Sequence, residues 1–153
     1  MVKMVQITLL KNKVAHQYLK NAYNEEFLNK IEHNYVIEND KDIIGFVQLC
    51  SFNENKFIKG YDLERYITND LGDKYTVVVE KLFVDEKYRN RGIGSFAADW
   101  IKTKYKNKRI LLCSLQDAEI FWMKQGFRQL EFPLIDDPDD VYDTDIYCYN
   151  GIS

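Results

Sequence analysis

The stretch from Tyr75 to Val84 constrains the fold of this chain more than any other segment. It is almost continuously apolar and β-branched, interrupted only by Glu80 and Lys81, as is typical of a central strand covered on both faces. Apolar residues then recur at helical spacing from near Gly92 onward. A buried strand that leads into an amphipathic helix predicts an α/β domain with a mixed sheet.

Shorter elements on both sides complete this architecture. Alternating or β-branched residues predict further strands, at Val5–Leu10, Tyr35–Glu38, Ile43–Phe52, Ile110–Leu115, Phe127–Pro133 and Thr144–Tyr149. Helical spacing predicts helices between Asn12 and Ile31, from Gly92, and at Ala118–Lys124. The polar turn Asn39–Asp42 joins two of the strands into a hairpin, and Asn53–Lys74 reads as a loop with a short helix.

Length and composition favour one folded domain. The 153 residues are 46% apolar and 29% charged, as expected for a globular protein. We therefore predict a single domain over residues 1–153. The net charge of -3 argues against nucleic acid or an anionic membrane as partner. No apolar run approaches the length of a membrane span, and we predict a cytoplasmic protein.

The cysteines predict neither disulfides nor a metal centre. Cys50, Cys113 and Cys148 are odd in number, far apart, and set within apolar stretches. Buried, reduced thiols fit this pattern, and no spacing typical of metal ligands appears.

The segment Val84–Ser95 carries the strongest chemical signal, because it joins the buried strand to a helix N-terminus. Backbone N–H groups and the positive end of the helix dipole converge there. Glycines at 92 and 94 allow a ligand close to the backbone, and Lys87, Arg89 and Arg91 add positive charge. Such a site suits an anion, and a pyrophosphate in particular.

Three interpretations of the two glycines fit the sequence poorly or explain little of it. A Walker loop requires Lys and then Ser or Thr after its last glycine, but Gly94 is followed by Ser95 and Phe96. Gly92–Ala97 satisfies a loose dinucleotide fingerprint, although the strand lies mid-chain and a polar connector intervenes. The glycines could also simply permit close packing of the helix on the sheet.

The Arg-x-x-Gly-x-Gly string of Arg89, Gly92 and Gly94 resembles the acyl-CoA signature of the GNAT superfamily of N-acetyltransferases. The segment Ala118–Phe127 is similar to a later helix and strand of the same family, and the resemblance is close over Tyr75–Phe132. It implies a mostly antiparallel sheet with helices on both faces. It also implies a splay between the two central strands, Tyr75–Val84 and Ile110–Leu115.

The resemblance further implies that acetyl-CoA is the cofactor, with its pantetheine arm hydrogen-bonded to the backbone near Leu82–Val84. The residues expected to contact the cofactor are Leu82, Phe83, Val84, Arg89, Asn90, Arg91, Gly92, Ile93, Gly94, Ser95, Phe121, Trp122 and Lys124. The expected reaction partner is an amine of a small molecule or a peptide, and a homodimer stays open.

Two departures from the family pattern affect catalysis more than cofactor binding. Trp122 stands where the family often has the Tyr that protonates the departing thiolate, and Leu115 stands where Asn is common. An indole cannot serve as a general acid at neutral pH. Trp122 therefore either packs beneath the sheet or has another role near the sulfur.

Glu80 is the predicted catalytic base, because it is the sole carboxylate in the predicted buried strand. Burial disfavours a charged carboxylate and would prepare it to accept a proton near neutral pH. A structural ion pair with a lysine of a neighbouring strand is the alternative. The predicted function is N-acetyltransfer from acetyl-CoA to an amine, and a non-catalytic acyl-CoA-binding module is the rival. An RNA-binding face along the basic residues from Lys87 to Arg109 is disfavoured by the overall acidity.

Overall fold

The computed structural model describes residues 5–9, 17, 34–40, 42–51, 76–115, 118–129 and 144–149. Its strands are β1 (Val5–Leu9), β2 (Asn34–Asn39), β3 (Asp42–Ser51), β4 (Thr76–Val84), β5 (Arg109–Leu115), β6 (Arg128–Gln129) and β7 (Thr144–Tyr149). Its helices are the 3-10 turn η3 (Glu86–Tyr88), α3 (Ile93–Lys104) and α4 (Glu119–Lys124).

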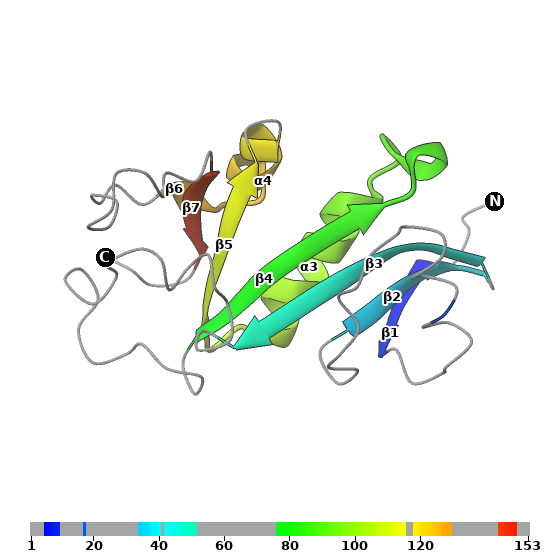
Figure 1. Cartoon of the computed structure of the whole chain (residues 1–153), viewed down its shortest axis with the longest axis horizontal. Coiled ribbons are helices and arrows are strands. Elements are labelled where there is room, and N and C mark those ends of the chain that lie inside the picture. Colours follow the sequence, from blue (N-terminus) through cyan, green and yellow to red (C-terminus); the bar gives the residue numbers. More distant parts are fainter. Residues whose placement is uncertain are drawn as a thin grey trace. The chain divides into compact units, whose positions relative to one another are not determined.

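The described strands form one mixed sheet in the order β1-β2-β3-β4-β5-β7-β6 (Figure 1). The pairs β1–β2, β2–β3, β5–β7 and β6–β7 are antiparallel, and β4–β5 is parallel. The predicted α/β class with a mixed, mostly antiparallel sheet is confirmed. The predicted helices between Asn12 and Ile31, the loop Asn53–Lys74 and the strand residues beyond Gln129 lie outside the described residues.

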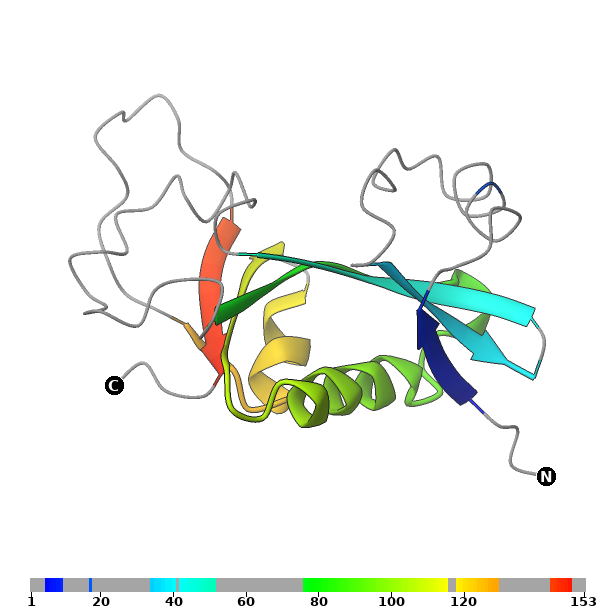
Figure 2. The ribbon, with the colours of Figure 1, turned by 90° about the horizontal axis from the view of Figure 1, so that it is seen from below.

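The chain forms two compact units. The first consists of Met1–Leu49 and Lys81–Trp100, and the second of Cys50–Glu80 and Ile101–Ser153. Strand β4 continues from the second unit into the first, and α3, which is unbroken in Figure 2, continues from the first into the second. The organisation of residues 1–153 as one domain stays a prediction.

The first unit is organised by the β2–β3 hairpin. Asp40 adopts a positive φ of 58° in the turn, a conformation that Asp tolerates better than most residues. Ile37, Ile44 and Val47 are fully buried, which accounts for the alternating and continuous apolar patterns of the two strands. The ring of Trp100, on α3, meets that of Tyr35 edge-on with centroids 4.8 Å apart.

Gly45 marks a very close approach of β4 to β3 in this unit. A Cβ at this position would overlap the carbonyl oxygen of Phe83 and crowd the side chain of Ile37. The amide of Asp85 donates to the carbonyl of Ile44 at 2.7 Å, so the end of β4 is hydrogen-bonded to the same segment. Glycine at position 45 is therefore required by the neighbouring backbone.

We expect Gly45→Val to destabilise the fold by about 1–3 kcal/mol, the usual cost of overpacking a well-packed interior. The obstacle is a backbone carbonyl, which cannot move aside as a flexible side chain can. Urea unfolding measures the loss. A matched Gly126→Ala change, at a glycine with φ of +90°, separates packing strain from backbone strain. Wild-type stability for Gly45→Val would show that the two strands adjust without cost.

The second unit is built on the parallel register of β4 and β5, which joins Thr76–Val79 to Arg109–Leu112. Residues Val77–Val79 and Ile110–Leu112 are buried, in agreement with their continuous apolar character. Strand β7 then pairs antiparallel along β5 from Ile110 to Leu115. The splay that the resemblance implies between the rest of β4 and β5 stays a prediction.

Two further observations concern the described part of the chain. Its helices all lack the length and apolarity that crossing a membrane requires. Cys50 and Cys148 are buried and form no disulfide, which confirms the predicted burial of these two cysteines. The side chain of Cys113 is not among those that the structure describes.

Candidate cofactor site

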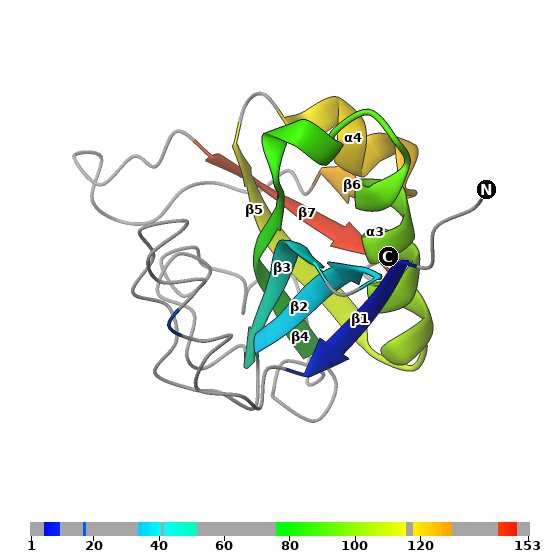
Figure 3. The ribbon, with the colours of Figure 1, turned by 90° about the vertical axis from the view of Figure 1, so that its right-hand side faces the viewer.

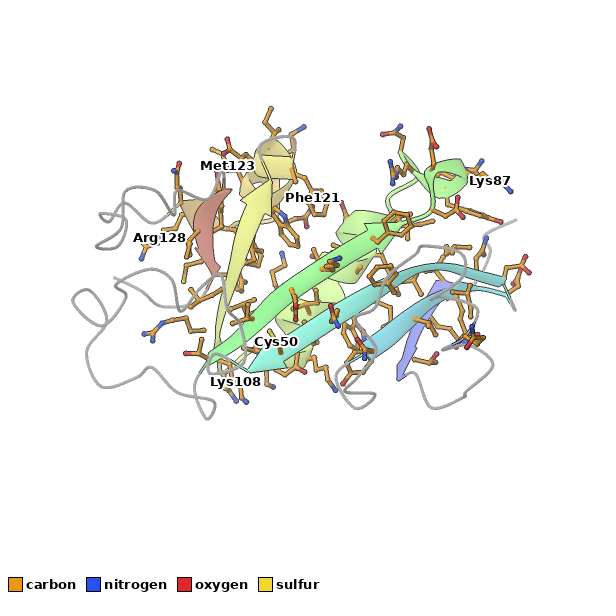
Figure 4. All side chains as sticks on the ribbon, viewed as in Figure 1. Cys50, Lys87, Lys108, Phe121, Met123 and Arg128 are labelled. Atoms are coloured by element: carbon orange, nitrogen blue, oxygen red, sulfur yellow. The ribbon has the colours of Figure 1, made fainter. Side chains whose placement is uncertain are left out.

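The connector after β4 is a capped turn. The Asp85 carboxylate accepts a hydrogen bond from the amide of Lys87 at 3.1 Å, and the carbonyl of Asp85 accepts from the amide of Tyr88 at 2.8 Å. This is the usual way in which Asp starts a helical turn. Figure 3 shows the chain leaving the end of β4, making this turn and entering α3. Figure 4 shows Lys87 projecting outward from the turn.

Two residues with positive φ then redirect the backbone into α3. Asn90 has φ of 63° and Gly92 has φ of 81°, values that glycine adopts freely and Asn tolerates. A Cβ built at Gly92 would meet no described atom within 4 Å. No described residue therefore crowds the backbone at Gly92.

The N-terminus of α3 has partial positive character. The first helical hydrogen bond runs from the amide of Phe96 to the carbonyl of Gly92 at 3.0 Å, so the N–H groups of Ile93, Gly94 and Ser95 precede the ladder. The first turn, all of it described, contains no acidic residue. The buried side chain of Ile93 anchors this turn to the core, and the helix dipole adds partial positive charge.

The signature arginine, Arg89, and the nearby Arg91 make different contacts. The Nε of Arg89 donates to the carbonyl of Val84 at 2.8 Å, and its guanidinium carbon lies 5.3 Å from the centre of the Phe83 ring. The guanidinium carbon of Arg91 lies 5.6 Å from the centre of the Tyr88 ring. Both arginines are exposed.

These features fit a phosphate-bearing cofactor. The donor set consists of first-turn amides and guanidinium groups, with open space at Gly92, and it suits anionic oxygens. Among the described residues, His, Cys, Asp and Glu form no group of three or more that could hold a metal ion.

The second signature forms an aromatic cluster in the second unit. Trp122 is 6% exposed, and its ring centre lies 4.9 Å from that of Phe121 and 5.1 Å from that of Phe127. Trp122 thus packs within an aromatic cluster, and a role near the sulfur stays a prediction. Lys124 is exposed in the last turn of α4. Phe121 and Met123 project from the same helix in Figure 4.

Lys102 fixes the end of α4. Its Nζ donates to the carbonyl of Gln125 at 2.9 Å and lies 5.3 Å from the centre of the Tyr149 ring. A cation at a helix C-terminus is favoured by the dipole. The same turn contains Gly126, whose φ is +90°, as expected for a helix-ending glycine.

The structure corrects the environment predicted for Glu80. Glu80 is exposed. It lies in β4 between Thr76–Val79, which are buried, and Lys81–Val84, which are half-buried. The prediction that the whole strand is buried was wrong for its second half. Burial therefore cannot be the reason for Glu80 to accept a proton.

The predicted site residues divide between the two units. The first unit brings together Leu82–Val84 and Arg89–Ser95, and the second contains Glu80, Phe121, Trp122 and Lys124. Gly45 and Phe46 were missed: the Phe46 ring stacks on that of Phe83 with centres 5.4 Å apart and planes inclined by 19°. The isolated glycine within an apolar strand was the available signal for this close packing.

Comparison with solved structures shows the same fold at low sequence identity. Arabidopsis thaliana Naa50, in complex with the bisubstrate analogue CoA-Ac-MVNAL, is 17% identical, with 96% of this chain and 99% of that chain covered and a TM-score of 0.60. The N-acetyltransferase YlbP of Bacillus subtilis, in complex with coenzyme A, is 20% identical, with 97% and 96% covered and a TM-score of 0.59.

N-acetylglutamate synthase from Neisseria gonorrhoeae, complexed with coenzyme A and L-arginine, is 15% identical with a TM-score of 0.65. The alignment covers 96% of this chain and 33% of the synthase. The curated proteins contain no significant match to the sequence. Residues 30–129 match the family model described as the acetyltransferase (GNAT) domain. Because that match spans more than half of the chain, this protein belongs to the GNAT acetyltransferase family.

Proposed function

We propose that this protein transfers an acetyl group from acetyl-CoA to an amine of a small molecule or a peptide. The observation that carries the proposal is the start of α3, where first-turn amides, open space at Gly92 and the exposed Arg91 coincide without an acidic residue. In a GNAT family member, this is the segment expected to hold the pyrophosphate.

The residues that would hold the cofactor follow from this placement. The amides of Ile93, Gly94 and Ser95 would donate to phosphate oxygens, and the half-buried backbone of Leu82–Val84 would orient the pantetheine arm. The contacts of Phe121, Trp122 and Lys124 with the cofactor stay predictions of the family resemblance. When bound, acetyl-CoA supplies a thioester as the acyl donor. Backbone N–H groups aimed at its carbonyl oxygen would favour attack by an amine.

The acceptor must lose a proton before it attacks. An alkyl ammonium with a pKa of about 10.4 is almost wholly protonated at pH 7. We propose that the carboxylate of Glu80 accepts this proton directly or through one water molecule. Its exposure makes it accessible to a solvated cationic amine, which its negative charge would also attract.

The solved relatives leave both acceptor classes open. Naa50 was complexed with an analogue that joins CoA to the peptide MVNAL, and N-acetylglutamate synthase with the amino acid L-arginine. We therefore propose an amine acceptor without choosing between them. A cytoplasmic location and a homodimer stay predictions.

The function is tested in two steps. A thermal-shift screen with coenzyme A, acetyl-CoA and longer acyl-CoAs should show stabilisation, and thiol release should then be measured with a panel of peptide N-termini, lysine, polyamines and amino acids. A protein that is not stabilised by any acyl-CoA would contradict the proposed cofactor. Stabilisation without thiol release from any amine would contradict the proposed reaction.

The packing of Trp122 favours one alternative function, a non-catalytic acyl-CoA-binding module. Its buried indole contacts the rings of Phe121 and Phe127. An indole cannot protonate a departing thiolate. Such a module would bind acetyl-CoA and release no thiol, so the second step above distinguishes it from the enzyme.

We expect Trp122→Phe to retain most of the acetyltransferase activity. The leaving thiol has a pKa of about 8.5 and needs little help from an acid, and the structure gives Trp122 a packing role. Steady-state thiol release with saturating acetyl-CoA measures the effect, and a modest loss of thermal stability serves as the sign that the cluster has been altered. A decrease of about 100-fold or more, which is typical of removing a general acid, would show that the indole acts in the reaction.

A further inference from the structure

Arg89 is held by an aromatic stack that begins in the core of the first unit. Phe46 is 2% exposed, its ring stacks on that of Phe83 at 5.4 Å, and the Phe83 ring in turn faces the guanidinium of Arg89 at 5.3 Å. Ring contacts thus link β3, β4 and the connector. The exposed side chain of Arg89 is held at two points, by the Phe83 ring and by the carbonyl of Val84.

A hydrogen bond also turns the side chain of Arg89 back toward the end of β4. Its Nε donates to the carbonyl of Val84 at 2.8 Å, across the capped turn that lies between the two residues. Arg89 itself has an extended backbone, with φ of -71° and ψ of 159°, and the chain bends at Asn90 directly afterwards. The side chain therefore fixes the point at which the connector leaves β4 for α3.

Arg91 is placed differently. It directly precedes Gly92, is exposed, and lies over the ring of Tyr88, which belongs to the same connector and not to the core. Among the described residues, the ring contact recorded for its guanidinium is with Tyr88, a half-buried residue of the same connector. A permanently charged, exposed group beside the first turn of α3 is suited to charge-assisted contact with phosphate oxygens.

We propose that Arg89 and Arg91 divide the work of cofactor binding: Arg89 is a positioning residue that sets the connector through Phe83 and Val84, and Arg91 supplies the charge that meets the pyrophosphate. This inference rests on the proposed function. It also means that cofactor affinity depends on the side chains of Phe46 and Phe83, although their rings do not contact the phosphates.

The two roles predict different responses to charge and salt, which calorimetric titration of coenzyme A at several salt concentrations measures. Arg91→Gln should weaken binding about 10-fold at low salt, as for loss of a charge-assisted hydrogen bond, and should flatten the salt dependence. Arg91→Lys should retain most of the affinity. Arg89→Gln and Arg89→Lys should both weaken binding about 10-fold and keep the wild-type salt dependence, because lysine cannot stack and donate as a planar guanidinium does.

A double-mutant cycle tests the stack itself. Phe83→Leu keeps an apolar side chain but removes the ring face, and it should weaken coenzyme A binding about as much as Arg89→Gln. The double variant should bind coenzyme A at most about twofold more weakly than Arg89→Gln does. The effects of two residues that act through one contact are not additive. Lys104→Gln, which removes an exposed cation in the last turn of α3, is the charge-matched control and should bind normally.

Several outcomes would overturn the inference. A flattened salt dependence for Arg89→Gln, rescue of affinity by Arg89→Lys, or additive effects of Phe83→Leu and Arg89→Gln would each show that Arg89 contacts the phosphates itself. Arg89→Lys leaves the core untouched, so it decides the matter even if Phe83→Leu does not fold. Absence of coenzyme A binding by the wild-type protein would instead overturn the proposed function, and the two failures are therefore distinguishable.

Discussion

Gly94→Asp is expected to abolish the stabilisation of this protein by acetyl-CoA. At one hundred times its dissociation constant, a ligand adds about 2.7 kcal/mol to the free energy of unfolding, which raises the melting temperature of a domain of this size by about 5–10 °C. The aspartate would place a side chain and a negative charge at the first turn of α3. Repulsion between this carboxylate and the phosphates should remove the whole shift.

The fold should survive this substitution. Positive φ among the described glycines is found at Gly92 and Gly126, and not at Gly94, so an L-residue can adopt the backbone conformation at 94. An acidic residue in the first turn of a helix is itself favourable. Gly94→Asn is the matched control, since it adds nearly the same volume without charge. A folded Gly94→Asp protein with an undiminished shift would place the cofactor elsewhere.

The passage from β4 into α3 was predictable because two periodicities meet there. The continuous apolar run of Val77–Val79 and the helical recurrence of Ile93, Ala97 and Ile101 identify a strand and a helix independently of one another, and the glycines mark where one gives way to the other. The structure places the helix start at Ile93, next to the predicted Gly92. Local sequence is sufficient here because both elements are defined by their own side chains.

The exposure of Glu80 was not predictable in the same way. An apolar pattern shows which residues can be buried, but whether a given face is covered depends on segments far away in the sequence. The first four residues of β4 are buried, whereas Leu82, Phe83 and Val84, which are also apolar, are only half-buried. A strand can thus change from an interior to a partly open environment within a single element, at the point where residues suited to ligand contact begin.

The stack of Phe46, Phe83 and Arg89 shows a second limit. The signature motif identifies Arg89 and the positions of the glycines, but it carries no information about the ring on which the guanidinium lies. That contact depends on the β3–β4 neighbourhood, and through it on Gly45, whose missing side chain admits the Phe83 carbonyl. Motifs therefore predict which residues bind, whereas the roles of individual side chains require the fold.

Glu80→Gln is expected to lower turnover at pH 7 by about 100-fold while leaving acetyl-CoA binding intact. With an ammonium pKa of about 10.4, roughly one amine in 2,500 is neutral at pH 7, so the reaction depends on a group that removes the ammonium proton before attack. Glutamine preserves the volume and the hydrogen-bonding outline of Glu80 but is neither basic nor charged. Single-turnover thiol release on cofactor-loaded enzyme isolates this step from cofactor affinity.

The pH profile of the variant distinguishes a base from a residue that merely attracts the amine. Each unit of pH raises the neutral fraction of the amine about tenfold below its pKa, so the Glu80→Gln rate should climb with pH toward the wild-type rate if proton removal is what it lacks. If the carboxylate only attracts a cationic acceptor, the variant should instead show a raised KM at every pH and an unchanged kcat. Asp42→Asn, at an exposed carboxylate at the start of β3, is the matched control and should behave as wild type. Normal turnover of Glu80→Gln from pH 6 to pH 9 would exclude Glu80 from proton transfer and leave solvent as the acceptor of the proton.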